Sequence, residues 1–275
     1  MKGDTDIRKA RTIPSKFYHS PKIHKKLKKL FDRSWQFVSD KTFLEKNNAH
    51  PGILLEGMLD EPYVLTKNKG DIRCLSNVCT HRGNIVCENT CKTKSLVCGY
   101  HGRQFHLDGK MKFMPEFDDV ENFPSNDDNL PEIEIDSWKD LIFIINKKRC
   151  ELSELIRPMI ERLDWLPVDE FVYKPKLSRT YKVNANWALY CDNYLEGFHI
   201  PFVHKGLNRE LEYEDYFTQG IDNTVLQIGI GKDNENTFDL PKEHQDYGKN
   251  VSAYYFFLFP NMMFNFYPWG LSINV

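Results

Sequence analysis

Short apolar runs, separated by Gly, Pro, Asn and Asp, make up much of the first half of the sequence. Runs of this length bounded by turn residues are typical of β-strands. We expect strands at 52–56, 63–66, 71–75, 95–98 and 141–145. Their close spacing predicts a small antiparallel sandwich or barrel, so residues 35–149 are expected to form an all-β domain.

Helical periodicity occurs on both sides of this region. Apolar residues at Ile23, Leu27, Leu30 and Phe31 fall at i, i+4, i+7 and i+8, which is one face of an amphipathic helix. Many of the residues between them are lysines, so residues 1–34 are interpreted as a basic helical segment with a solvated outer face.

Helices and strands are mixed in residues 150–275. Residues 152–163 have helical spacing, 173–184 resemble a strand, and a helix is expected from Trp187 up to Pro201. Strand patterns return from Val225 to the end of the sequence. The chain as a whole is therefore predicted to be α+β, with the all-β domain first.

Composition excludes several classes of function. The 37 basic residues balance 39 acidic ones, so no overall field would attract nucleic acid or an anionic membrane. No run of about 18 apolar residues is present, which argues against a transmembrane helix. Seven cysteines, an odd number in a chain of 275 residues, do not suggest a disulfide scaffold. We therefore expect a cytoplasmic protein with no nucleic-acid or membrane partner.

Two short segments each pair a cysteine with a histidine: Cys79-Thr-His81 and Cys98-Gly-Tyr-His101. Two such loops can bring four ligands together, and thiolate with imidazole suits zinc or an iron–sulfur cluster. The spacing alone does not separate these two. Because each loop supplies one cysteine and one histidine, the arrangement favours a Rieske [2Fe–2S] centre over a zinc finger.

The flanks of these pairs carry a family resemblance. Cys79-Thr-His81-Arg-Gly, followed by Cys98-Gly-Tyr-His101-Gly-Arg-Gln-Phe, resembles the Rieske domain of the non-haem iron oxygenase α subunits. The resemblance implies that these two cysteines and two histidines bind a Rieske [2Fe–2S] cluster. Cys87 and Cys91 do not stand where cytochrome bc-type Rieske proteins place their disulfide, and we interpret them as free thiols.

A carboxylate and two histidines follow in the second half. Glu196 and His199 are three residues apart, so we expect them on one face of a helix, with Asp192 one turn earlier. His204 follows Pro201, which is expected to break the helix and turn a second imidazole towards the same point. Two histidines with a carboxylate are the ligand set of non-haem Fe(II) oxygenases.

This segment resembles the oxygenase signature Asp/Glu-Asn-x-x-Asp/Glu-x-x-His-x4-His. The resemblance implies that His199 and His204 bind the mononuclear iron and that Glu196 is the electron-transfer bridge to a Rieske histidine of a neighbouring subunit. Asp192 is expected to support the site without binding metal. In the family the third ligand is a carboxylate on a long C-terminal helix. We find none here, so residues 150–275 are interpreted as an incomplete helix-grip (SRPBCC/START-like) catalytic domain of a C-terminally incomplete chain.

The resemblance implies an oxidoreductase and its partners. A ferredoxin or flavin reductase, driven by NAD(P)H, would reduce the cluster, which would pass electrons to mononuclear Fe(II). O2 would then be used to hydroxylate or demethylate a small organic substrate, in a homo-oligomer expected to be a trimer. The acidic stretch 115–137, with nine acidic and no basic residues, is either a solvated loop or a docking surface for a basic redox partner.

Substrate hints come from residues 254–269, which hold nine aromatic side chains. Aromatic walls suit aromatic substrates, and they suit quaternary ammonium groups through cation–π contacts. The sequences of residues 192–199 and 262–270 resemble those of choline monooxygenase-like members of the family, which favours a quaternary ammonium compound as the substrate. Three alternatives remain: a ring-hydroxylating dioxygenase of an aromatic substrate, a non-catalytic Rieske electron carrier, and a zinc-stabilised binding module.

Overall fold

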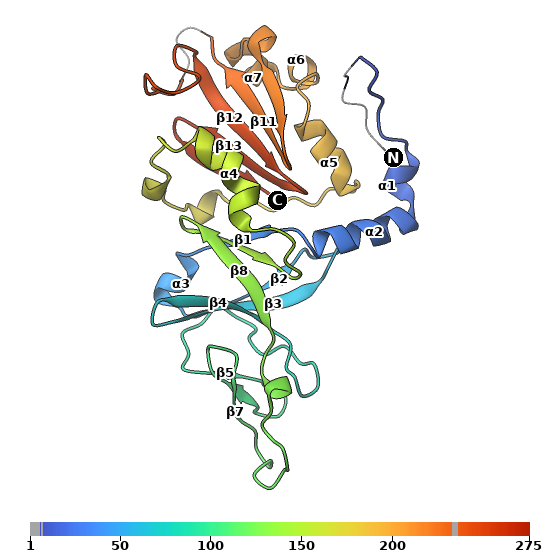
Figure 1. Cartoon of the computed structure of the whole chain (residues 1–275), viewed down its shortest axis with the longest axis vertical. Coiled ribbons are helices and arrows are strands. Elements are labelled where there is room, and N and C mark those ends of the chain that lie inside the picture. Colours follow the sequence, from blue (N-terminus) through green and yellow to red (C-terminus); the bar gives the residue numbers. More distant parts are fainter. Residues whose placement is uncertain (1–5, 7, 233–235) are drawn as a thin grey trace.

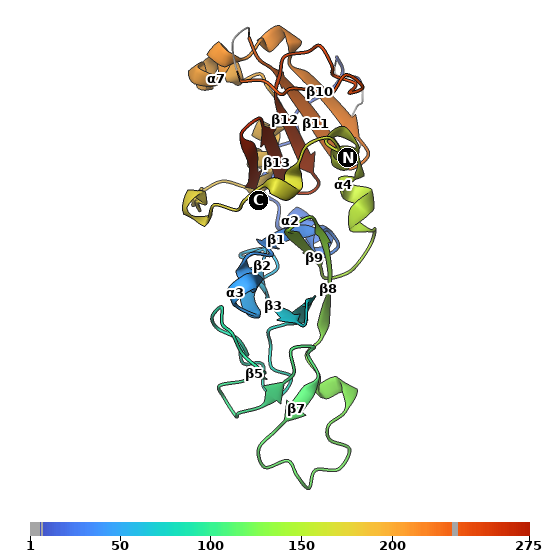
Figure 2. The same ribbon diagram turned by 90° about the vertical axis from the view of Figure 1, so that its left-hand side faces the viewer.

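Three antiparallel sheets follow one another along the long axis of the molecule (Figures 1 and 2). The computed structural model describes residues 6, 8–232 and 236–275. A six-stranded sheet of order β1-β9-β8-β4-β3-β2 lies in the middle. A three-stranded sheet, β5-β6-β7, lies at one end, and a five-stranded meander, β10 to β14, lies at the other.

The middle and small sheets are built from the short apolar runs. The strands of the middle sheet are β1 (Gln36–Asp40), β2 (Ala49–Leu54), β3 (Glu61–Asn68), β4 (Asp71–Ser76), β8 (Glu132–Trp138) and β9 (Leu141–Ile145). Those of the small sheet are β5 (Leu96–Val97), β6 (Gln104–Phe105) and β7 (Met111–Phe113). All five expected strand segments overlap an observed strand.

The sequence did not predict strand β8. We assigned its residues to an acidic loop, but Ile133 and Trp138 are buried and Glu132 and Glu134 are exposed. The acidic residues therefore form the solvent face of an alternating strand, which explains why their charges could be mistaken for loop composition. Residues 115–131 before it do form a loop, which contains one short 3-10 turn, η1 (Asn126–Asp128).

The five-stranded sheet of β10 to β14, called the upper sheet below, has one helix packed on each face. Its strands are β10 (Phe217–Ile221), β11 (Thr224–Ile230), β12 (Val251–Leu258), β13 (Met262–Tyr267) and β14 (Gly270–Asn274). Tyr254 and Phe256 share a core with helix α4 (Leu152–Arg162), whereas Phe257 packs in a separate cluster with Cys191 of helix α5 (Trp187–Tyr194). The aromatic residues of β12 thus alternate between the two faces, as strand geometry requires.

The core continues from the upper sheet into the middle one. The rings of Phe143 in β9 and Phe264 in β13 are stacked with centroids 6.2 Å apart. The backbone amide of Phe37 in β1 donates to the Met262 sulfur at 3.1 Å. Residues 35–149 and 150–275 therefore share a hydrophobic core, and the boundary between them stays a prediction from sequence.

The basic N-terminal segment folds into α1 (Lys16–His19) and α2 (Pro21–Phe31), and α2 has the predicted apolar face. Phe31 is buried, and its ring meets that of Trp187 in α5 edge-on at 4.9 Å. The lysines of α2 are exposed. No helix in the described part of the chain is both long and apolar enough to cross a bilayer.

Two expectations for the second half are wrong. Residues 173–184 form no strand but an extended, exposed segment with one 3-10 turn, η3 (Pro175–Leu177). Tyr181 is 80% exposed, because the segment joins no sheet that would bury its apolar residues. The helix expected to reach Pro201 ends at Tyr194, and two short helices follow, α6 (Ile200–Val203) and α7 (Lys205–Glu210). The remaining short elements are α3 (Phe43–Lys46), η2 (Val168–Glu170) and η4 (Tyr213–Asp215).

Candidate metal centres

The two Cys/His loops have the same backbone design. The amide of Gly83 donates to the carbonyl of Cys79 at 2.9 Å, and that of Gly102 donates to the carbonyl of Cys98 at 3.0 Å. Both glycines have φ of 72°, a left-handed conformation that glycine adopts without steric cost. The glycine four residues after each cysteine is therefore what lets each loop close and present its ligands.

The four side chains form a pair of sulfurs and a pair of imidazoles. Cys79 and Cys98 lie close enough for each thiol to influence the pKa of the other, and the two residues are 3% and 2% exposed. The rings of His81 and His101 are half-buried, with centroids 4.7 Å apart. Like ligands thus lie together, which suits a cluster of two irons with two cysteines on one and two histidines on the other.

The ligand atoms have an environment that fits such a cluster. Nδ1 of His81 is buried, and no hydrogen-bond partner for it is found in the described structure. A buried nitrogen in this state is costly unless something binds it, and a metal ion would do so. Burial lowers the pKa of His81, as do the nearby charges of His101 and Arg82, so the imidazole is held in the neutral form that binds metal.

The two thiols differ in acidity. Burial raises the pKa of Cys79. Burial acts in the same direction on Cys98, but hydrogen bonds from the Tyr100 amide and from Cys79 outweigh it and lower its pKa. The side-chain amide of Asn84 lies 3.7 Å from the Cys98 sulfur. Hydrogen bonds of this kind tune the potential of an iron–sulfur cluster.

A buried arginine ties these loops to the acidic segment. Nη2 of Arg103 donates to Oδ1 of Asp128 at 2.6 Å, and the hydroxyl of Thr80 donates to the carbonyl of Asp128 at 2.7 Å. The guanidinium also lies over the rings of Phe105 and Phe123. The sequence does not indicate this contact, because Arg103 and Asp128 are 25 positions apart and have no local pattern in common.

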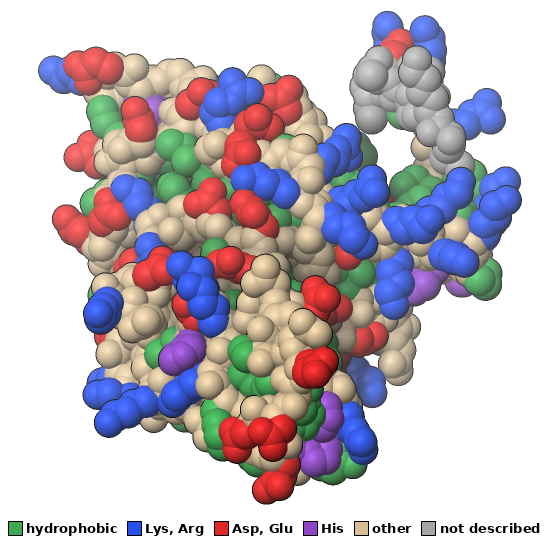
Figure 3. All heavy atoms as spheres, turned by 60° about the horizontal axis from the view of Figure 1, so that its bottom comes forward, with side chains coloured by type: hydrophobic (Ala, Val, Ile, Leu, Met, Phe, Trp, Pro, Cys, Tyr) green, Lys and Arg blue, Asp and Glu red, His purple; other side chains and the backbone are tan. Residues whose placement is uncertain are grey.

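Aromatic and acidic side chains border the exposed edge of the imidazoles. Tyr100 lies against His101 with ring centroids 3.8 Å apart, and Phe117 meets His81 at 6.2 Å. Five acidic residues of the same loop are exposed: Glu116, Asp118, Asp119, Glu121 and Asp127. Figure 3, which turns this end of the molecule forward, shows acidic side chains beside histidines on one surface. We call these five residues the acidic rim.

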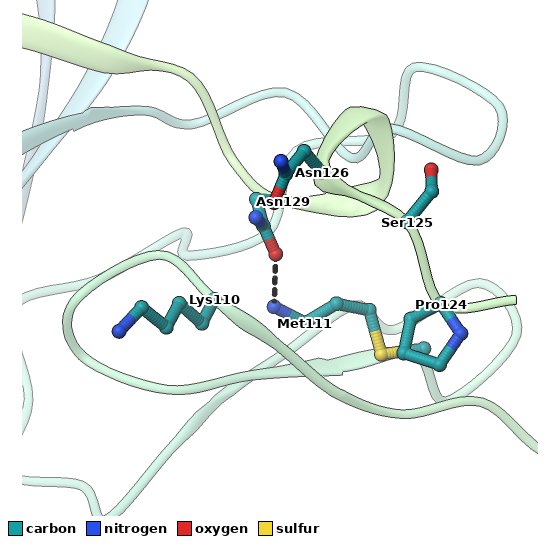
Figure 4. Close-up of a pocket in the computed structure, with 6 residues that line it drawn as sticks. All are labelled: Lys110, Met111, Pro124, Ser125, Asn126 and Asn129. Atoms are coloured by element: carbon teal, nitrogen blue, oxygen red, sulfur yellow. Dashed lines mark hydrogen bonds between the residues drawn. The ribbon is translucent and has the colours of Figure 1, made fainter.

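A surface hollow of about 480 Å³ lies beside this loop (Figure 4). It is lined by Lys110, Met111, Pro124, Ser125, Asn126 and Asn129. The side-chain oxygen of Asn129 accepts from the amide of Met111 at 2.8 Å across it. This bond fixes the end of the acidic loop to strand β7.

The second candidate centre lies beyond helix α5. Oε1 of Glu196 is 2.6 Å from Nδ1 of His199, so their predicted proximity is found. The helix has ended by then, and a turn at residues 195–199 makes the contact, with Gly197 against the ring of Tyr216. A Cβ at Gly197 would lie 3.1 Å from that ring.

His204 is brought to the same place by α6. Its ring centroid lies 5.0 Å from that of His199, at an angle of 73°. Pro201 lies in the first turn of α6, so it begins a short helix instead of ending a long one. Because Glu196 binds Nδ1 of His199, Nε2 is left as the nitrogen that can bind a metal.

The described residues supply these two imidazoles but no complete ligand set for one ion. Within residues 8–232 and 236–275, no group of three or more His, Cys, Asp or Glu side chains is gathered closely enough to hold a single metal ion. The third carboxylate that the resemblance implies is therefore not assigned.

Asp192 is bound to the N-terminal segment. Its Oδ2 accepts a hydrogen bond from the hydroxyl of Tyr18 at 2.5 Å. The side chain of Asn186 donates to the carbonyl of Tyr18 at 2.9 Å and also caps α5. The supporting role of Asp192 near the iron stays a prediction. Its observed contact fixes α1 and α2 to the helix that precedes Glu196.

A chain of polar contacts runs from the Glu196 turn into the upper sheet. The hydroxyl of Tyr216 donates to Oε1 of Gln227 at 3.1 Å, and Nε2 of Gln227 donates to the carbonyl of Tyr194 at 2.7 Å. The hydroxyl of Tyr194 donates to Oδ1 of Asn265 at 2.7 Å. Burial raises the pKa of both Tyr194 and Tyr216, so both stay protonated donors. Sequence reasoning missed Tyr216 and Tyr194 as neighbours of Glu196.

Comparisons with known proteins find both halves of this arrangement. Residues 34–124 match the Rieske [2Fe-2S] domain, and residues 168–275 match the catalytic domain of ring hydroxylating alpha subunits. The chloroplastic choline monooxygenase of Arabidopsis thaliana is 28% identical over 96% of this chain and 64% of its own length. That of Beta vulgaris is 26% identical over 97% and 59%. The carnitine monooxygenase oxygenase subunit of Escherichia coli is 27% identical over 94% and 68%.

Solved structures share the fold over most of the chain. The quaternary ammonium Rieske monooxygenase CntA, bound to an inhibitor, has a TM-score of 0.80 at 23% identity, covering 96% of this chain and 71% of its own. Naphthalene 1,2-dioxygenase from Rhodococcus sp. has a TM-score of 0.73 at 20% identity, covering 92% and 64%. The predicted fold class, an all-β Rieske domain followed by a catalytic domain, is confirmed.

The chain spans 59% and 64% of the length of the two choline monooxygenases named above. Over that length it carries both domains in the same order, each with its own candidate metal ligands. It belongs to the family of Rieske-type non-haem iron oxygenase α subunits.

Proposed function

We propose that this chain is the oxygenase component of a Rieske non-haem iron monooxygenase that acts on a quaternary ammonium compound. The observation that carries the proposal is the contact of Glu196 with His199 at 2.6 Å beside His204, in a chain that also pairs Cys79 with Cys98 and His81 with His101. A Rieske electron carrier would need only the two cysteines and two histidines of the cluster site, and not Glu196, His199 and His204. Both sets together support catalysis.

Each set of residues has a separate task. When bound, a [2Fe–2S] cluster supplies one-electron transfer and a mononuclear iron supplies O2 chemistry. Cys79 and Cys98 bury their side of the first centre, while the edges of His81 and His101 reach the surface. Glu196 holds the proton on Nδ1 of His199 and orients the ring, so that Nε2 is the metal ligand.

The two centres of one chain lie at opposite ends of the molecule (Figures 1 and 2). The loops around β5 and β7 are at one end, and α6 and α7 are at the other. A direct route between the two centres of one protomer would have to cross the whole middle sheet. We therefore infer that the imidazole end of one protomer approaches Glu196 of another, in a homo-oligomer that we expect to be a trimer.

The electron donor would meet the same exposed end. The acidic rim beside His81 and His101 fits a ferredoxin or flavin reductase with a basic surface, because opposite charges speed the encounter. All seven cysteines are free, which supports a reducing, cytoplasmic setting.

The tyrosines near Glu196 support the substrate class. Tyr216 packs on Gly197, and Tyr255 and Tyr267 meet edge-on at 5.8 Å in the neighbouring strands. Tyr267 stacks on Trp269 at 4.8 Å. Aromatic faces bind quaternary ammonium groups by cation–π attraction, and the relatives named above act on choline and carnitine.

Complementation between inactive variants tests the proposal. Cys79→Ser removes a cluster ligand and His199→Ala removes an iron ligand, so each alone is expected to lose substrate-coupled O2 uptake. Co-expressed, they should recover part of it, because an intact cluster end of one protomer can face an intact Glu196 of another. Choline, carnitine and naphthalene serve as test substrates.

In the control, Cys79→Ser is co-expressed with the double variant Cys79→Ser/His199→Ala. No protomer of this mixture has a cluster, so no substrate-coupled O2 uptake should be recovered. A mixed preparation that stays inactive would argue against transfer between subunits. If the unchanged protein passes electrons to an added acceptor but never couples O2 to any substrate, the electron-carrier alternative replaces the oxygenase.

A further inference from the structure

Gln227 of β11 is a buried amide to which the proposed function gives no task. Its side chain lies on the face of the upper sheet that packs against α5, and the residue is 1% exposed. The surroundings on this face are largely apolar, since Phe257 and Met263 form a cluster with Cys191 of α5. An amide without hydrogen bonds would be costly in such a place, so the partners of Gln227 indicate its role.

Both ends of this amide bind residues at the turn that follows α5. Nε2 donates to the carbonyl of Tyr194 at 2.7 Å, and Oε1 accepts from the hydroxyl of Tyr216 at 3.1 Å. Tyr194 is the last residue of α5, and the last carbonyls of a helix have no partner within it. The ring of Tyr216 packs against Gly197. Gln227 therefore holds the turn at its beginning and, through Tyr216, at its middle.

The neighbouring strands add a second contact to Tyr194. Gln227 pairs with Tyr255 of β12, which pairs with Asn265 of β13, so these three residues form one row across the sheet. Oδ1 of Asn265 accepts from the hydroxyl of Tyr194 at 2.7 Å. Tyr194 is thus bound to the row by its carbonyl and by its side chain, which fixes the end of α5 over the sheet.

We propose that Gln227 is a positioning residue for His199. By fixing the turn at 195–199 to the sheet, it keeps Glu196 in contact with Nδ1 of His199 and leaves Nε2 as the nitrogen for the metal. The inference rests on the proposed function, in which His199 binds the mononuclear iron.

The bonds inside the turn do not connect it to the sheet. The carboxylate of Glu196 accepts from the amide of Phe198 and contacts Nδ1 of His199, so both of its oxygens are used within the turn. These bonds set the shape of the turn, whereas the bonds of Gln227 set its place relative to the sheet. Without Gln227 we expect the turn to shift and the contact between the rings of His199 and His204 to loosen.

Gln227→Met tests the inference, because it keeps the length of the side chain but forms neither hydrogen bond. Thr224→Val is the matched control. Thr224 is also buried in β11, but its hydroxyl donates to the carbonyl of Leu155 in α4, on the other face of the sheet. Hydrogen exchange of the amides at 195–199 should accelerate in Gln227→Met, whereas Thr224→Val should accelerate exchange in α4 and leave 195–199 unchanged. This measurement needs no bound iron.

Tyr216→Phe is a second variant, for the case in which Gln227→Met does not fold. It removes the hydroxyl that donates to Gln227 but keeps the ring that packs against Gly197. The same acceleration of exchange at 195–199 is expected, to a smaller extent, because the bond from Gln227 to Tyr194 remains.

A double-mutant cycle on iron affinity tests whether Gln227 acts through Glu196. In cluster-loaded protein titrated anaerobically with Fe(II), Gln227→Met should weaken binding at the mononuclear site by about tenfold, as expected for a group that orients a metal ligand. In a Glu196→Gln background the same change should have little further effect. The EPR signal of the nitric oxide complex of this iron should change in Gln227→Met and stay the same in Thr224→Val.

Two results would overturn the inference while leaving the proposed function intact. One is equal exchange at 195–199 in Gln227→Met and the unchanged protein, which would mean that the turn keeps its place without Gln227. The other is losses of iron affinity that add fully in the double variant, which would mean that Gln227 does not act through Glu196. An unchanged protein that binds no Fe(II) beyond its cluster would overturn the proposed function and this inference with it.

Discussion

The carboxylate of Glu196 lies 2.6 Å from Nδ1 of His199, although no helix contains both residues. The turn at 195–199 makes this contact, and the ring of Tyr216 supports it through Gly197. Glu196 is therefore the group that determines which nitrogen of His199 carries the proton.

Replacement of Glu196 by glutamine tests this role. Glu196→Gln keeps the size of the side chain but removes its charge, so it should lower substrate-coupled turnover or mononuclear iron affinity by about 10- to 100-fold. The Rieske spectrum should be unchanged. Glu210→Gln, at an exposed position in α7, is the matched control and should retain wild-type turnover. Equal activity of the two variants would show that the contact has no role.

Removal of the hydroxyl of Tyr18 should loosen the N-terminal helices. Tyr18→Phe deletes the hydrogen bond to Asp192, which should cost about 1.5–3 kcal/mol of local stability, since the acceptor is charged. Hydrogen exchange of the amides in α1 and α2 should accelerate. Tyr173→Phe, which removes an exposed hydroxyl contact with Ser178, should leave that exchange unchanged.

A buried ion pair beneath the upper sheet predicts a pH-dependent stability. Arg162 and Asp246 are in contact at 2.9 Å with side chains 10% and 2% exposed. Asp246→Asn leaves the arginine unpaired and should lower the free energy of unfolding by about 3–5 kcal/mol at pH 7. Asp222→Asn, in the exposed pair with Arg157, should cost about 0–1 kcal/mol.

The sign of the pH effect follows from the pKa of Asp246. Burial acts to raise it, but hydrogen bonds from Lys249 and Tyr254 and the charge of Arg162 outweigh burial and lower it. The contribution is therefore complete above the unfolded pKa of about 3.9 and is lost as pH falls through the lower folded value. The difference between the unchanged protein and Asp246→Asn, measured by denaturant unfolding, should narrow below about pH 4. A constant difference down to pH 2 would be inconsistent with a lowered pKa.

Two glycines with positive φ allow the cost of an unfavourable backbone conformation to be measured separately from the cost of steric overlap. At Gly109, with φ of 85°, a Cβ would meet Leu75 at 2.9 Å and the Leu130 carbonyl at 3.1 Å. At Gly70, with φ of 96°, it would meet open space. Gly70→Ala should cost only the conformational penalty of about 1–2 kcal/mol, and Gly109→Ala should cost about 1–3 kcal/mol more. Thermal unfolding of both variants measures the difference.

Features could be predicted from the sequence where the interacting residues lie close together in the chain. The loops at Cys79 and Cys98 are local, and the glycine that closes each loop has the same φ of 72°. The contact of Glu196 with His199 was predicted correctly from a spacing of three but for the wrong reason, since the helix stops at Tyr194.

Contacts between distant segments escaped prediction. Tyr18 and Asp192 are 174 positions apart, and nothing near either residue indicates the other. Strand β8 was missed because its acidic residues all face solvent, and residues 173–184 were wrongly predicted as a strand because apolar residues suggested burial that no sheet provides. Local sequence patterns indicate turns and the alternation of buried and exposed residues, whereas which distant segments contact each other depends on the whole fold.

The most direct test of the central claim is the content of iron, zinc and acid-labile sulfide in anaerobically purified protein, with EPR of the dithionite-reduced sample. If Cys79, Cys98, His81 and His101 hold a Rieske cluster, iron and labile sulfide will be found together with the EPR signal of mixed histidine and cysteine ligation. Iron in excess of sulfide would add support for a second ion at His199 and His204. Zinc without sulfide would contradict the account.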